Sequence, residues 1–255
     1  MNSIFFYILI RSWNAYSNFD KCIDSVFKQQ YDRYKILFVD DATPLNILQK
    51  KHISQKLKGH IVVFNKKKLS SLRNSYLMIH KFAKKNEAVV FNLDGDDWLP
   101  HSNCLKTVAS YYKKNDKCQL TYGDCSIWDG KNMIRSARSS LPFTNIPYPK
   151  NIVKNRGFRK HFFLPLHPKT WKVSLYKKIK INDFLKPNND WIKYAEDQAI
   201  FFPLLEMSGK NFGLINKPIY VYNTSHKFSD MKINYLGLLK DELVIRKKKP
   251  YAQAT

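Results

Sequence analysis

Cysteine is scarce in this 255-residue chain, and the four cysteines present follow no metal-binding spacing. No two of them form a CxxC pair, and they do not combine with the seven histidines into a zinc pattern. Scattered cysteines of this kind are typical of small buried side chains in a reducing compartment. A disulfide framework and a structural zinc site are therefore not predicted.

Long hydrophobic runs are also missing, and no run approaches the roughly 20 apolar residues that span a bilayer as a helix. The N-terminal run Ile4–Ile10 has no basic leader and is followed at once by Arg11, so it predicts a strand and not a signal peptide. No internal repeat is present. The chain is expected to form one large α/β domain with a short appendage, in the cytoplasm or peripherally at the inner face of a membrane.

Acidic residues are few, with 20 Asp and Glu against 44 Lys and Arg, which gives a formal net charge of +24. Such charge attracts anions, including nucleotides, phospholipid headgroups, nucleic acid and acidic glycans, without choosing among them. A nucleic-acid-binding protein would carry a recognised module in which base-stacking aromatics alternate with basic residues. No such module is present, so nucleic acid is not an expected partner.

Three aspartates are nevertheless concentrated in one stretch, Glu87–Leu99, which reads EAVVFNLDGDDWL. Its apolar first half is typical of a strand buried on both faces. Asp94, Asp96 and Asp97 follow at once, and carboxylates so close together repel one another unless a cation lies between them. Mg²⁺ or Mn²⁺ prefers carboxylate oxygens and keeps positions for substrate phosphates. The alternative is an acidic turn that caps the next helix.

Strand-like and helix-like segments alternate through the first half of the chain. Strands are expected at 4–10, 34–39, 61–64, 88–93 and 118–122. Helices are expected at about 17–30 and at about 102–114. Two further helices are expected to begin at Pro44 and at Ser70 or Ser71. This alternation predicts a mostly parallel sheet with right-handed crossovers. Ligands collect beyond the carboxyl ends of such strands, where Asp41 and the Asp94–Asp97 group are expected to lie.

The second half is less regular. Asp129-Gly130 predicts a hairpin turn, and the basic stretch 135–160 has no clear periodicity. Further elements are a helix at Lys169–Ile179, an apolar helix opened by Glu196-Asp197, strands at 212–215 and 218–222, and a basic helix at about 232–249.

Several short motifs follow one another along this pattern. They are Ser12-Trp13-Asn14, Gln29-Gln30-Tyr31, Val39-Asp40-Asp41, Leu72-Arg73-Asn74, Leu93–Asp97 and Glu196-Asp197-Gln198. Their order and spacing resemble the family 2 glycosyltransferases of GT-A fold, over roughly residues 4–225 and most strongly in the first 125. The resemblance implies an α/β, Rossmann-like GT-A domain at 1–228, with a nucleotide-binding half at 1–125 and an acceptor-binding half at 126–228. Residues 229–255 would form a basic helical tail.

The family transfers a sugar, with inversion, from a nucleotide diphosphate to an acceptor hydroxyl. The resemblance implies that Asp94 and Asp96 form the DxD pair, with Asp96 as the direct ligand of Mn²⁺ or Mg²⁺ and Asp97 close by. It implies that Asp197 is the general base that takes the acceptor proton. His226 falls where some GT-A enzymes have a further metal or phosphate ligand.

Donor binding follows from the same resemblance. Asp41 matches the nucleoside-binding aspartate, with Asp40 and Asn14 beside it, and Arg73 matches an element near the nucleotide. His167, within the segment LPLHPKTW, is a candidate for lining the donor-sugar or acceptor pocket. A UDP-sugar is the expected donor, and the acceptor is expected to be a glycan or a lipid-linked glycan, with the basic tail in contact with an anionic membrane or with the acceptor.

Plainer interpretations stay open for each position. Asp41 could cap a helix, Asp197 could be a first-turn acid placed against the helix dipole, and Arg73 could be solvated. The metal-binding carboxylates alone would also fit a nucleotidyltransferase or a phosphohydrolase. Two departures from the family pattern affect donor-base recognition: Arg11 stands where the family commonly has proline, and Lys66–Lys68 replaces the glycine usual after the third strand.

Overall fold

The structure, a computed structural model, describes residues 3–134, 136–137, 144–225 and 234–254. The first half contains β1 (Phe6–Ser12), α1 (Tyr16–Phe27), β2 (Tyr34–Asp40), α2 (Ile47–Lys56), β3 (Ile61–Phe64), α3 (Ser71–Phe82), β4 (Val89–Asp94), α4 (Cys104–Lys114) and β5 (Leu120–Trp128). The second half contains β6 (Met133–Ile134), α6 (Lys150–Asn155), η1 (Phe158–Lys160), β7 (Lys169–Lys172), α7 (Val173–Tyr176), η2 (Ile181–Phe184), α8 (Glu196–Ser208), β8 (Phe212–Asn223) and α10 (Tyr235–Lys247).

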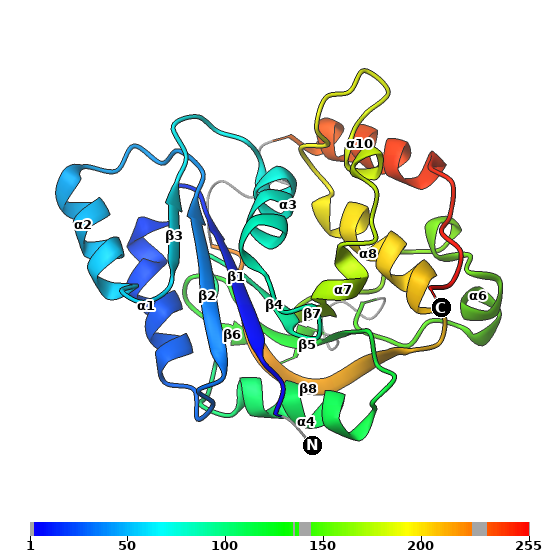
Figure 1. Ribbon diagram of the computed structural model, residues 1–255, viewed down its shortest axis with the longest axis horizontal. Helices are drawn as coiled ribbons and strands as arrows, with labels where there is room; N and C mark the ends of the chain where they lie inside the picture. Colours follow the sequence, from blue (N-terminus) through cyan, green and yellow to red (C-terminus); the bar gives the residue numbers. More distant parts are fainter. Residues whose placement is uncertain (1–2, 135, 138–143, 226–233, 255) are drawn as a thin grey trace.

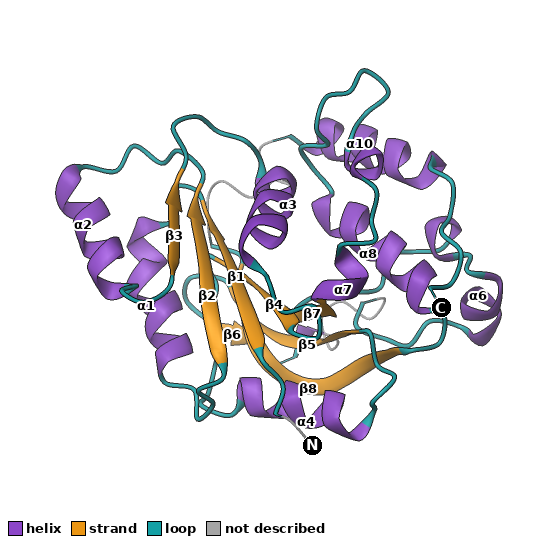
Figure 2. Ribbon diagram, in the orientation of Figure 1, coloured by secondary structure: helices purple, strands orange, loops and turns teal. Residues whose placement is uncertain are grey.

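The strands form one sheet in the order β3-β2-β1-β4-β7-β5-β6, with β8 paired to β5. β1 pairs in parallel with β2 and β4, β2 pairs in parallel with β3, and β7 lies antiparallel between β4 and β5. Helices cover both sides of the sheet (Figures 1 and 2). The predicted α/β fold with a mostly parallel sheet flanked by helices is confirmed.

Alternate residues of the strands supply two separate hydrophobic cores, because successive side chains in a strand point to opposite faces. In β1, Phe6, Ile8 and Ile10 pack on the side that carries α1 and α4. Tyr7 and Leu9 pack on the other side, with apolar side chains from α3, α7 and α8. The strand is therefore apolar at every position up to Ile10, which explains its unbroken hydrophobic run.

The helix predicted at Lys169–Ile179 is wrong in its first part. Residues Lys169–Lys172 form β7, and only the short α7 follows. All of Lys169, Thr170 and Trp171 are buried, because β4 and β5 flank the segment and helices cover the sheet. A strand of four residues is too short to reveal its period, so tertiary pairing decides its conformation.

The strands predicted at 212–215 and 218–222 are one continuous strand, β8, of 12 residues. Its pairing with β5 shifts register between Gly123 and Asp124 and again between Asp124 and Ser126. These irregularities let one strand bend and continue through Pro218, where the sequence suggests a break between two strands. The turn at Asp129-Gly130 does join the antiparallel strands β5 and β6, as predicted.

The basic helix predicted at about 232–249 corresponds to α10 within the described residues. Asp241 and Ile245 are buried on its inner side. Arg246 Nη1 donates to the carbonyl oxygens of Arg159 and His161 at 2.7 and 2.8 Å, which ties α10 to η1. No helix among the residues that the structure describes is long and apolar enough to cross a bilayer.

Candidate active site

The predicted acidic groups lie at the carboxyl edge of the parallel strands. Ser12 is level with Asp40 and Arg11 is level with Asp94 in the registers of β1 with β2 and β4. Gly95 makes this arrangement feasible, because a Cβ there would lie 2.9 Å from the carbonyl oxygen of Arg11. Glycine therefore lets the turn after β4 approach β1 closely enough to present its aspartates at this edge.

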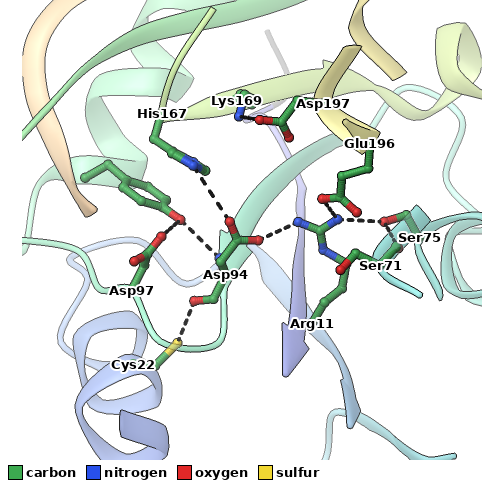
Figure 3. A network of polar contacts seen from close by, with 11 residues as sticks. Arg11, Cys22, Ser71, Ser75, Asp94, Asp97, His167, Lys169, Glu196 and Asp197 are labelled. Carbon is green, nitrogen blue, oxygen red and sulfur yellow. Dashed lines mark hydrogen bonds and ion pairs between the residues drawn. The ribbon is translucent and has the colours of Figure 1, made fainter. Parts of the chain in front are cut away.

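Asp94, Asp97 and His167 form a cluster that could hold a metal ion. One ligand atom from each lies within 4.8 Å of the other two. His167 Nε2 is 3.7 Å from Asp94 Oδ2 (Figure 3). Buried His167 Nδ1 has no hydrogen-bond partner among the described residues. Two carboxylates and an imidazole are a donor set that suits Mn²⁺, so these residues fit the cation that the sequence predicts.

The electrostatics of the cluster also favour a cation. Burial raises the pKa of Asp97 well above its ordinary value, and the carboxylates of Asp96 and Asp94 raise it further. Burial opposes ionisation of Asp94 as well, but Arg11 and then His167 bring the pKa of Asp94 below its ordinary value. Burial lowers the pKa of His167 to about 3, so its imidazole is neutral and able to bind a metal.

β8 holds Asp97 in place. Tyr220 donates its hydroxyl to Asp97 Oδ2 at 2.5 Å, and the backbone N–H of Asn223 donates to Oδ1 at 2.7 Å. The Tyr220 ring stacks on His167 with centroids 4.4 Å apart. Half-exposed Asp96, the ligand predicted from the resemblance, is outside the three-residue cluster; Asn223 Nδ2 donates to its backbone carbonyl at 3.1 Å.

Arg11 connects this cluster to helix α8. Its guanidinium is buried and pairs with Asp94 Oδ1 on one side and Glu196 Oε1 on the other, and it donates to Ser75 Oγ at 3.2 Å (Figure 3). Burial alone would lower the pKa of Arg11, but Glu196 and Asp94 raise it overall. Burial raises the pKa of Glu196 to about 7, although Arg11 acts in the opposite sense. Arg11 thus fixes one oxygen of Asp94 and leaves the other facing His167.

Asp197 lies in the first turn of α8, where the helix dipole favours a negative charge. Its Oδ2 accepts a hydrogen bond of 2.5 Å from Lys169 Nζ on β7. Lys169 is buried, whereas the side chain of Asp197 is partly exposed. A carboxylate that is held by a buried cation and open to solvent can take a proton from a group that arrives from outside.

The residues predicted to bind the nucleoside order the loops beside this edge. Asp41 is buried and accepts hydrogen bonds from Asn65 Nδ2 at 2.8 Å, Leu69 N at 2.8 Å and Ser70 N at 3.0 Å. Its carboxylate therefore stabilises the loop between β3 and α3. Arg73 lies on α3 with its guanidinium carbon 5.7 Å from the ring centre of Trp191.

Asp40 and Asn14 are joined through Thr43. Thr43 donates its backbone N–H to Asp40 Oδ1 at 2.8 Å and its hydroxyl to Oδ2 at 2.6 Å. The backbone N–H of Asn14 donates to Thr43 Oγ1 at 2.9 Å, and Asn14 has a φ of 52°. These contacts fix the turn after β1 against the end of β2.

Three contributors at this edge came from segments that the sequence pattern did not connect with it. The sequence pattern places Arg11 at the end of an apolar run and as a departure from the family motif, without a role in the site, and it does not single out Lys169 or Tyr220. A charged residue at the end of an otherwise apolar strand was a usable signal for Arg11. His226 lies outside the described residues.

Comparisons with known proteins concern the family and the fold of the chain. The sequence model for glycosyl transferase family 2 matches residues 7–179. A comparison with curated proteins finds no match. Among solved structures, the fold is similar to that of residues 1–349 of S. aureus TarS, with a TM-score of 0.61 and 16% identity over 86% of this chain and 60% of that chain.

The TarS complexes with UDP and with UDP-GlcNAc both give a TM-score of 0.62, at 15% and 14% identity. They cover 95% and 93% of this chain and 65% and 64% of those chains, so this chain spans less than two thirds of their length. At identities this low, the structural similarity shows the fold alone. The family follows from the match to the sequence model, which covers more than half of the chain. The chain belongs to glycosyl transferase family 2.

Proposed function

We propose that the chain transfers a sugar, with inversion, from a UDP-sugar to a hydroxyl of a glycan or lipid-linked acceptor. The acceptor oxygen attacks the anomeric carbon, the bond from that carbon to the diphosphate oxygen breaks, UDP leaves, and Asp197 takes the acceptor proton. A single displacement of this kind leaves no covalent sugar intermediate, so the anomeric configuration inverts.

The observation that carries this proposal is the presence of two separate acidic sites, with Arg11 lying between Asp94 of one and Glu196, the residue next to Asp197, of the other. The cluster of Asp94, Asp97 and His167 suits a cation, and Asp197 is a separate carboxylate held by Lys169. Inverting transfer needs both parts, because one carboxylate must accept the proton while a different group offsets charge on the leaving diphosphate. A phosphohydrolase or nucleotidyltransferase needs no such second carboxylate for an acceptor hydroxyl.

Asp94, Asp97 and His167 would hold Mn²⁺ or Mg²⁺, with Asp96 beside them. A divalent cation bound there supplies charge compensation for the diphosphate leaving group. Arg11 holds Asp94 in orientation, and Tyr220 and Asn223 hold Asp97. Asp41, Asp40, Asn14 and Arg73 would lie around the nucleoside.

UDP is favoured as the nucleotide because related structures of this fold bind UDP and UDP-GlcNAc. The test is incubation of the protein with UDP-, GDP-, CDP- and dTDP-sugars in the presence of Mn²⁺, followed by NMR of the products. We expect release of UDP with a free or transferred sugar of inverted configuration. Release of UMP or pyrophosphate would instead assign a phosphohydrolase or nucleotidyltransferase, and a retained configuration would exclude inversion.

A further inference from the structure

The outward face of α10 carries three exposed leucines beside its lysines, and such a row of leucines is unusual on the solvent side of a helix at a protein surface. Leu236, Leu239 and Leu243 are spaced by three and four residues, so they lie on one face of the helix. Leu236 is 69% exposed and Leu243 is 58% exposed. The described part of the chain therefore leaves a continuous leucine face open to solvent.

The opposite face of α10 is firmly attached to the protein. Ile245 is buried, and buried Asp241 accepts hydrogen bonds of 2.9 Å from the backbone N–H groups of Lys193 and Tyr194. Asp241 also pairs with Lys186 at 2.6 Å. Because the inner face has these partners, the helix cannot rotate to bury its outer leucines without losing them.

Further apolar surface continues beyond the helix. Arg246 donates a hydrogen bond to the carbonyl oxygen of His161. Phe162, which follows His161 in the chain, is 75% exposed. Basic residues border the leucines, since Lys240 and Lys247 are exposed and follow Leu236 and Leu243 by one helical turn. A face of leucines bordered by lysines is typical of a helix that lies in the interface of an anionic bilayer.

We propose that the outer face of α10, formed by Leu236, Leu239 and Leu243 with Lys240 and Lys247, docks on an anionic lipid bilayer. The charge of the protein favours anionic lipid as the partner of this face, because a chain with a net charge of +24 is attracted to anionic headgroups. The leucines would enter the acyl boundary while the lysines contact headgroup phosphates.

The position of α10 relates the proposed docking to the candidate active site. The helix lies on the side of the molecule toward which β2 and β3 run, the side of the candidate site (Figure 1). A bilayer under α10 would bring a lipid-linked acceptor toward Asp197. This consequence rests on the glycosyltransferase function proposed above, whereas the docking itself does not.

Co-sedimentation of the full chain with vesicles tests the docking. One vesicle population contains phosphatidylcholine alone, and the other contains phosphatidylcholine with phosphatidylglycerol. We expect binding to the anionic vesicles, weakened on the order of tenfold or more in Leu236→Ser/Leu243→Ser, because two leucines no longer enter the bilayer. Lys240→Gln/Lys247→Gln should weaken it on the order of tenfold and reduce its salt dependence.

Exposed apolar residues elsewhere supply the matched control. Ile47 and Leu48 on α2 are 84% and 75% exposed, and Ile47→Ser/Leu48→Ser should bind vesicles as the wild type does. No vesicle binding by the wild type at low salt, or equal loss in the α2 variant, would overturn the proposal. So would a dimer in sedimentation velocity that Leu236→Ser/Leu243→Ser dissociates, because a second copy would then cover this face.

Calorimetry with UDP and Mn²⁺ separates this inference from the proposed function. The α10 variants should bind UDP as the wild type does, because α10 supplies no residue to the Asp94, Asp97 and His167 cluster. A variant that loses vesicle binding and keeps UDP binding is altered in the docking face and not in the donor site. Absent UDP binding in a protein that still binds vesicles would reject the donor assignment and leave the docking intact.

Discussion

Replacing Asp197 by asparagine is expected to lower the rate of sugar transfer by roughly 10²–10⁴, the range for loss of a general base. The amide keeps the shape of the side chain but cannot accept the acceptor proton. Donor and Mn²⁺ affinity should stay within a few-fold of the wild type, because Asp197 contacts Lys169 and belongs to the separate acidic site. Steady-state kinetics and calorimetry measure the two effects separately.

Asp190→Asn is the control for this experiment, because Asp190 is exposed and its carboxylate is bonded locally to Asn188. It should leave both transfer and affinity unchanged. An Asp197→Asn variant that transfers sugar at the wild-type rate would remove Asp197 from the mechanism, and with it the inverting assignment.

Replacing Arg11 by methionine is expected to lower the free energy of unfolding by about 3–5 kcal/mol, the cost typical of removing one partner from a buried ion pair. Arg11 is buried, and its loss leaves Asp94 and Glu196 facing one another without the cation between them. Urea denaturation of the metal-free protein measures the change. Arg33→Met at an exposed position should change stability by less than about 0.5 kcal/mol.

Arg11→Lys keeps the charge but has a single nitrogen, whereas the guanidinium contacts Asp94 through Nη2 and Glu196 through Nη1. This variant should fold, and it should bind Mn²⁺ roughly 10–100-fold more weakly, because residues that orient a metal ligand have effects of that size. Wild-type stability in Arg11→Met, together with wild-type Mn²⁺ affinity in Arg11→Lys, would contradict the role assigned to Arg11.

Most of the first half of the fold could be predicted because its longer strands and helices show their own period. The four-residue β3 is an exception in length, but all four of its residues are apolar. β1, β2 and β4 are apolar runs ending in polar residues, and parallel strands place those ends at one edge. The same reasoning brings Asp41 and the Asp94–Asp97 group to a common edge without knowledge of any side-chain contact.

The second half could not be predicted equally well because its conformation depends on partners distant in sequence. β7 is a strand because it fits between β4 and β5, and the sequence around Lys169 does not carry that information. The contacts of Arg11 with Glu196 and of Asp97 with Tyr220 span 185 and 123 residues. Sequence motifs identified the carboxylates, whereas the cations and the tyrosine that orient them required the fold.

We propose above all that the carboxyl edge of β4 binds a nucleotide diphosphate through a divalent cation. Isothermal calorimetry of UDP with the wild-type protein, once with Mn²⁺ and once with EDTA, tests it most directly. We predict affinity at least about tenfold higher with Mn²⁺, a difference of about 1.4 kcal/mol, because the aspartates otherwise face the diphosphate with like charge. Equal affinity under the two conditions would contradict the claim.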